Sequence, residues 1–157
     1  MVRRLIYGSS AVRDFPPEEL KRLLGQSRVN NRAAGITGAL LYLNGNFFQL
    51  LEGAAPDIEA TFRRIECDRR HRGIIVFSDT EVAERTFPIW SMGFRSLSPD
   101  DLASHADLFR LDHEQFMHRL AGDLDRYVTI LVDTFLRIND PDADTDPPVS
   151  RGASARR

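Results

Sequence analysis

The sequence predicts an α+β fold with the element order βαββαββ and two helices on one face of the sheet. Three observations lead to this prediction. Short apolar runs typical of strands recur along the first two thirds of the chain, two segments between them show helical spacing, and an Asn-Gly pair separates two of the runs. The helices do not alternate strictly with the strands, which favours α+β packing over a parallel sheet.

The first strand is predicted over residues 3–9, where Leu5, Tyr7 and Ser9 occupy alternate positions and therefore share one face. A helix should begin at the two successive prolines that follow, because prolines and then two glutamates suit a first helical turn, and it should end before Gly35. One face of this helix combines apolar and polar residues: Leu20, Leu23, Leu24, Ser27 and Asn31.

Two strands, over residues 37–43 and 47–51, should form a hairpin around Asn44 and Gly45, since both residue types accept positive φ. Asp57 should cap a second helix. The buried face of that helix should consist of Ile58, Phe62 and Ile65.

The fourth strand is predicted over residues 73–77, and the fifth where Trp90, Met92 and Phe94 share one parity. The first and third strands are expected to be central neighbours, as in ferredoxin-like folds. With a right-handed crossover through the first helix, both helices then cover the same face of the sheet.

The sequence divides into three parts. Residues 1–97 form the predicted α+β domain, 98–139 a helical extension, and 140–157 a tail rich in Pro, Asp, Ser and Arg that is expected to be disordered. The extension carries an apolar stripe at helical spacing, which needs a covering surface. We call it the C-terminal stripe, and it consists of Phe116, Leu120, Leu124, Tyr127, Leu131, Phe135 and Ile138.

Composition excludes several classes of protein. The formal net charge is -2, so no general attraction to nucleic acid or to an anionic membrane is expected. Cys67 is the single cysteine, which excludes an internal disulfide and fits the cytoplasm. No apolar run approaches the ~20 residues of a membrane span, and the start of the chain does not resemble a signal peptide.

Motifs for catalysis and metal binding are absent from the sequence. There is no phosphate-binding glycine loop, nucleophile elbow or zinc-protease signature, so no enzyme activity is expected. The spacings of His105, His113 and His118 match no standard metal site, and solvated histidines are the commoner case.

Three polar residues occupy positions where the pattern calls for apolar ones. Ser27 and Asn31 continue the apolar face of the first helix, and Gln49 interrupts an apolar strand. If the first and third strands are neighbours, Tyr7 and Gln49 meet on the face that the helices cover. A buried amide without a partner costs about 1–3 kcal/mol. Two interpretations follow: a planar ligand with donors and acceptors, or core polar groups satisfied by backbone and water.

The chain also resembles the BLUF family, sensors of blue light using FAD, over residues 3–96. Five motifs carry the resemblance, in the expected order. They are Ser27-Arg28-Val29-Asn30-Asn31, Gly35-Ile36-Thr37-Gly38-Ala39-Leu40-Leu41-Tyr42, Phe47-Phe48-Gln49-Leu50-Leu51-Glu52-Gly53, Asp68-Arg69-Arg70-His71 and Phe87-Pro88-Ile89-Trp90-Ser91-Met92-Gly93-Phe94.

The resemblance implies a role for each polar residue at the flavin. Tyr7 matches the family's photoactive tyrosine, and Gln49 the glutamine between that tyrosine and the flavin. Asn31 matches the asparagine that holds the ring edge, with Ser27 as a further polar residue of the site. FAD is the implied cofactor, and FMN or riboflavin would satisfy the same ring contacts.

The remaining matches concern the far end of the ring and the output. Arg70 and His71 match the loop at the pyrimidine end of the flavin. Trp90 and Met92 match the fifth-strand pair that responds to the glutamine, and we group Ser9 with them as a signal-relay residue.

The resemblance implies a photoreceptor, not an enzyme, of the short stand-alone type. Light would drive an electron and a proton from the tyrosine and back, leaving rearranged hydrogen bonds. The signal would then pass through the fifth strand and the C-terminal helices to an unidentified signalling protein or within a homo-oligomer. Two alternatives on the same fold are an acylphosphatase-like hydrolase and a flavin-free protein-interaction module.

Overall fold

The computed structural model describes residues 1–88, 93–96 and 134. The predicted order βαββαββ is confirmed, while the predicted C-terminal helices and tail lie outside the described residues, apart from residue 134. The elements are β1 (Val2–Ala11), α1 (Pro17–Ala33), β2 (Thr37–Leu43), β3 (Asn46–Gly53), α2 (Ala55–Glu66), β4 (His71–Val82) and β5 (Gly93–Ser96).

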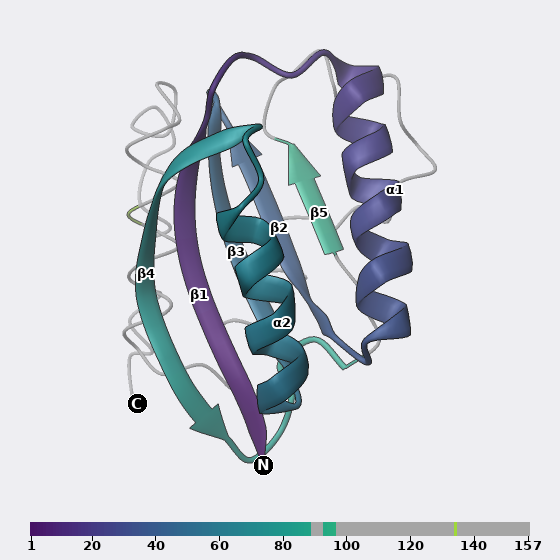
Figure 1. The fold of residues 1–157 in the computed structure, drawn as a ribbon, viewed down its shortest axis with the longest axis vertical. Coiled ribbons are helices and arrows are strands. Elements are labelled where there is room, and N and C mark those ends of the chain that lie inside the picture. Colours follow the sequence, from purple (N-terminus) through teal and green to yellow (C-terminus); the bar gives the residue numbers. More distant parts are fainter. Residues whose placement is uncertain (89–92, 97–133, 135–157) are drawn as a thin grey trace, which may run out of the picture.

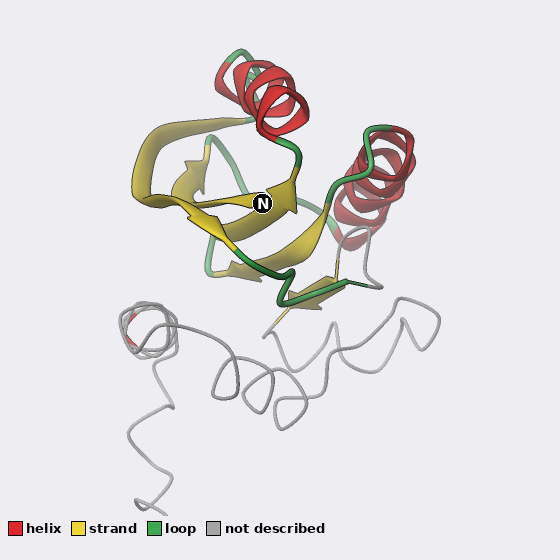
Figure 2. Cartoon of the chain, turned by 90° about the horizontal axis from the view of Figure 1, so that it is seen from below, coloured by secondary structure: helices red, strands yellow, loops and turns green. Residues whose placement is uncertain are grey.

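These strands form one sheet in the order β4-β1-β3-β2-β5. β1 pairs antiparallel with β3 and β4, β2 pairs antiparallel with β3, and β5 runs parallel to β2. Figures 1 and 2 show α1 and α2 on the same face of the sheet. The ferredoxin-like arrangement with β1 and β3 as central neighbours is therefore confirmed.

The predicted start of α1 at the prolines and the predicted hairpin turn are both confirmed. α1 begins at Pro17, with Pro16 as its N-cap, and ends at Ala33 before a glycine of positive φ. In the hairpin, Asn44 and Gly45 both have positive φ, at 48° and 75°, as a two-residue turn between antiparallel strands requires.

The predicted cap of α2 is wrong. The helix begins at Ala55 with Ala54 as N-cap, and no side chain caps it. Pro56 explains the earlier start, because proline has no N–H to leave unsatisfied in a first turn. Asp57 instead lies inside that turn, where its charge suits the helix dipole.

β4 is longer than the predicted strand 73–77, because β1 offers it a pairing partner from Val2 to Ala11. Its polar and charged residues hid this length, since β4 lies at the edge of the sheet and much of it is exposed. Two register shifts mark where the strand departs from regular pairing with β1.

The core between the sheet and the helices consists of large side chains that are at most 1% exposed. They fix the height of both helices above β1 and β3, and each contributes about 1.5–3 kcal/mol through burial. These residues are Leu5, Leu24, Ile36, Leu51 and Ile58. Phe62 and Ile65, predicted as buried, are half-buried and pack against this cluster.

Candidate functional site

Tyr7 and Gln49 meet at the centre of the sheet. They are direct partners in the register of β1 and β3, and the Tyr7 hydroxyl donates a hydrogen bond to Oε1 of Gln49. Both residues are buried, at 3% and 7% exposed, and both line a hollow between the helices. The predicted contact on the helix-covered face is therefore confirmed.

α1 supplies the polar wall opposite these strands. Asn31 is 4% exposed although it lies one turn beyond the half-buried Ser27. With Gln49 and Arg70, these two residues line a hollow of about 320 Å³, within the range of small-molecule sites. A smaller hollow of about 70 Å³ adjoins it, reaches Tyr7, and shares Ser27, Gln49 and Arg70 with it.

His71, the first residue of β4, lines the smaller hollow and makes hydrogen bonds to β1 and to α2. Its Nε2 lies 2.9 Å from the carbonyl oxygen of Ile65, and its Nδ1 lies 3.0 Å from Oγ of Ser9. A carbonyl only accepts hydrogen bonds, so Nε2 carries a proton. In the neutral ring Ser9 then donates to Nδ1, which connects Ser9 to the lining of the site.

Asp68, to which the sequence analysis gave no role, forms an ion pair with Arg70 at the edge of both hollows. The Arg70 guanidinium donates to both carboxylate oxygens, with Nε 2.9 Å from Oδ1. These bonds lower the pKa of Asp68 and raise the pKa of Arg70. The pair therefore holds the arginine head beside the cavity, and the short spacing in Asp68-Arg69-Arg70 was the available signal.

The surroundings of Tyr7 keep its phenol protonated. Burial is the larger cause that holds the pKa of Tyr7 well above its usual range, and the negative charge of Asp68 adds to it. The ring packs edge-to-face on Phe62, with centroids 5.5 Å apart. Tyr7 therefore keeps its hydroxyl proton at neutral pH and can donate it in a hydrogen bond.

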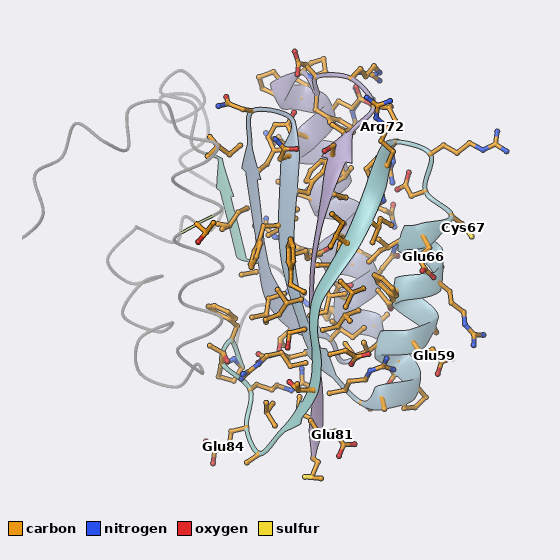
Figure 3. All side chains as sticks on the ribbon, turned by 90° about the vertical axis from the view of Figure 1, so that its left-hand side faces the viewer. Glu59, Glu66, Cys67, Arg72, Glu81 and Glu84 are labelled. Carbon is orange, nitrogen blue, oxygen red and sulfur yellow. The ribbon has the colours of Figure 1, made fainter. Side chains whose placement is uncertain are left out.

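Some of the residues that the sequence analysis singled out lie outside the part of the chain that the structure describes. Trp90 and Met92 lie outside the described residues, as do His105, His113 and His118. Figure 3 places Arg72 at the start of β4 and Cys67 just after α2, and both are exposed.

Neither a metal cluster nor a membrane span occurs in the part of the chain that the structure describes. Within those residues, no group of three or more His, Cys, Asp or Glu side chains is arranged to hold a metal ion. None of the described helices is long and apolar enough to cross a membrane.

Comparison with known proteins identifies the family. A family model described as BLUF, sensors of blue-light using FAD, matches residues 2–93, more than half of the chain. The chain belongs to the BLUF family. Flavin-based sensing of blue light is thereby the family function, and neither the hydrolase nor the flavin-free interaction module is favoured.

The proteins to which this chain is similar include much longer proteins and a shorter one. The photoactivated adenylate cyclase subunit beta of Euglena gracilis is 29% identical over 106 residues, which cover 66% of this chain but 12% of that protein. The Klebsiella pneumoniae BlrP1 structure with FMN and cyclic diGMP is 30% identical, with a TM-score of 0.67, and the match covers 87% of this chain and 35% of BlrP1.

BlrB, a BLUF protein whose structure represents the dark state, matches over nearly its whole length. The identity is 29% and the TM-score 0.60, and the match covers 84% of this chain and 96% of BlrB. The chain therefore spans a small part of the cyclase subunit and of BlrP1, and nearly all of BlrB.

The lining of the cavity fits the flavin that defines the family. A flavin ring is flat, and its pyrimidine edge carries both hydrogen-bond donors and acceptors. The two carboxamides Asn31 and Gln49, the Ser27 hydroxyl and the Arg70 guanidinium supply both kinds of partner. These residues would hold the ring between α1 and α2, over the core side chains of the sheet.

Proposed function

We propose that this chain is a blue-light photoreceptor whose light response is a rearrangement of the hydrogen bond between Tyr7 and Gln49. One observation carries the proposal: a buried tyrosine donates to a carboxamide that itself lines a cavity of ligand size. A carboxamide presents an acceptor at one end and a donor at the other, so turning it over changes every bond that it makes.

The other polar residues would hold the cofactor. Asn31 and Ser27 would bind the ring edge from α1. Arg70, in the loop before β4, would bind the pyrimidine end, and His71, the first residue of β4, would lie beside that end. The Asp68–Arg70 ion pair supports this role, because it fixes the guanidinium beside the cavity. FAD is the proposed cofactor, with FMN or riboflavin as alternatives that share the ring.

When bound, the flavin supplies a strong oxidant on absorbing blue light. Tyr7 would lose an electron and its hydroxyl proton, and the proton would pass to Oε1 of Gln49. Both would return to Tyr7, so no net reaction takes place. The carboxamide would be left rotated or tautomerised. If it is rotated, Nε2 faces the Tyr7 hydroxyl, which must then accept instead of donate.

Relay of this change would pass from the site towards β5. Trp90 and Met92 precede β5 in the sequence, and Ser9 is connected to the cavity lining through His71. Only a contact that differs between the two states can shift a downstream equilibrium. We therefore propose that Gln49 and its strand neighbours make that differential contact.

The output would be a binding event and not a chemical reaction by this chain. We propose that the chain acts in the cytoplasm, without enzymatic activity of its own, on a partner protein or through a homo-oligomer. The C-terminal stripe, which lies outside the described residues, is the proposed interface for either one.

The test is an absorption spectrum of the purified chain before and after blue light. We expect a yellow protein whose flavin bands shift slightly to the red in light and return in the dark. Mass spectrometry of the released chromophore separates FAD from FMN and riboflavin. A colourless protein that does not take up added flavin would overturn the proposal.

A further inference from the structure

A fully buried carboxylate lies on the face of the sheet opposite the cavity. Glu52 is 0% exposed, and its Oε1 accepts from Nε of Arg4 at 2.9 Å. The same oxygen accepts from the backbone N–H of Thr86 at 3.0 Å, and Oε2 accepts from that of Phe87 at 3.0 Å. Arg4 completes the cluster by donating to Oγ1 of Thr86 at 2.6 Å.

The residues held in this way belong to the connection that crosses the sheet. β4 lies at one edge of the sheet and β5 at the other, so the chain that leaves β4 must pass β1, β3 and β2 to reach β5. Figure 2 shows the described part of this connection on the side of the sheet away from the helices. Glu52 and Arg4 contact it midway, from the two central strands.

Arg85 adds a second attachment to the same connection. Its NH1 donates to the carbonyl oxygen of Glu52 at 2.8 Å and to Oγ1 of Thr37 at 2.9 Å. Its NH2 donates to the carbonyl oxygen of Gly35 at 2.7 Å, just after α1 ends. The connection is therefore tied to β2, to β3 and to the end of the helix that carries Asn31.

This cluster and the candidate flavin site share one pair of strands. Arg4 and Glu52 are register partners in the β1–β3 ladder, three residues along from the partners Tyr7 and Gln49. Three residues is an odd number, so the two pairs project to opposite faces. A buried ion pair adds little net stability compared with an apolar pair of similar size, whereas its directional bonds specify position.

We propose that Glu52, with Arg4 and Arg85, is a positioning residue that couples the site to the segment entering β5. We call this cluster the Glu52 anchor. It holds residues 85–87 against the strands that carry Tyr7 and Gln49, so a shift of those strands moves the chain that continues to Trp90. The inference rests on the proposed function, because it assigns the route by which the same site signals.

The test uses Trp90, the single tryptophan of the chain, as reporter. Glu52→Gln keeps the shape but loses the charge opposite Arg4, and its amide NH2 places a donor where an acceptor is needed. We expect a normal flavin red shift in this variant, together with loss of the light-induced change in Trp90 fluorescence and acrylamide quenching. Asp79→Asn, which removes the charge of an exposed partner of Arg3, is the matched control and should behave like the wild type.

Arg85→Met provides a second variant in case Glu52→Gln does not fold, because Arg85 is only partly buried. It should likewise keep the red shift and lose the Trp90 response. A wild-type Trp90 response in either folded variant would overturn the inference, as would a red shift in the wild type with no Trp90 response. Absence of the red shift in the wild type would instead overturn the proposed function.

Discussion

Each face of the β1–β3 ladder carries one buried polar pair, and the two pairs differ in charge and in their surroundings. On the helix face, Tyr7 and Gln49 are neutral groups beside a cavity. On the other face, Arg4 and Glu52 are charged, and the carboxylate is held from both of its oxygens by an arginine and two backbone N–H groups. The same pair of strands therefore presents one adaptable pair and one fixed pair.

The two pairs also differ in whether their hydrogen bonds can be rearranged. A carboxamide that turns over exchanges an acceptor for a donor, and a neighbouring hydroxyl adapts to either. A carboxylate only accepts and a guanidinium only donates, so the two groups of the Glu52 anchor cannot exchange donor and acceptor roles. A two-state change on one face can then move the chain held on the other without changing how it is held.

Removing the adaptable carboxamide should have the largest effect on the response. We expect Gln49→Ala to bind flavin and to lose the light-induced red shift completely, because nothing remains to exchange its bonds with Tyr7. Gln26→Ala is the matched control, because it removes the carboxamide of an exposed residue that lines the same cavity but bonds to Asn30 and not to Tyr7. A shift of normal size in Gln49→Ala would contradict the division between the two faces.

Tyr7→Phe removes the donor of the same pair and keeps the ring that packs on Phe62. The red shift should again be lost, while the variant stays yellow and folded. Tyr42→Phe is the control, because it deletes the hydroxyl of another buried tyrosine whose partner is the backbone N–H of Phe15, 3.4 Å away. Light-minus-dark absorption spectra of the two variants measure the red shift. A retained shift in Tyr7→Phe would contradict the role of Tyr7 as the donor.

On the opposite face the largest effect should be on stability. Glu52→Ala leaves Arg4 and two backbone N–H groups buried without their acceptor, so the free energy of unfolding should fall by about 3–5 kcal/mol. Asp79→Ala, which breaks the exposed ion pair with Arg3, should cost about 0–1 kcal/mol. Urea unfolding monitored by circular dichroism gives both values, and equal losses would mean that the anchor is an ordinary surface pair.

The sequence alone predicted the helix-covered face with Tyr7 and Gln49 better than the opposite face with Arg4 and Glu52. Alternation put Tyr7 on the helix-covered face, and the amide of Gln49 inside an apolar strand indicated a polar site there. Asn44 and Gly45 fixed the hairpin that sets the register of β2 against β3. Each of these signals is local, which is why a single sequence carries it.

The sequence analysis missed the buried pair of Arg4 and Glu52 because the burial of these residues depends on the fold. Arg4 and Glu52 stand near strand ends, where charged residues are ordinarily exposed. Only the pairing of β1 with β3 brings them together, and only the contacts with Thr86 and Phe87 of the connection after β4 complete their burial. The wrong cap at Asp57 has a local cause, since Pro56 moved the helix start, whereas the full length of β4 depends on its pairing with β1.

The smallest expected effect concerns the proton of Tyr7 at alkaline pH. Burial raises the pKa of Tyr7, so above pH ~10 the unfolded chain loses this proton while the folded chain keeps it. The folded state then binds more protons, and its stability should fall with rising pH by about 1.4 kcal/mol per pH unit for this group. Tyr7→Phe should show a shallower alkaline decline of the free energy of unfolding than the wild type. Because all other titrating groups are common to both proteins, parallel declines would mean that the Tyr7 phenol is not held in its protonated form by the fold.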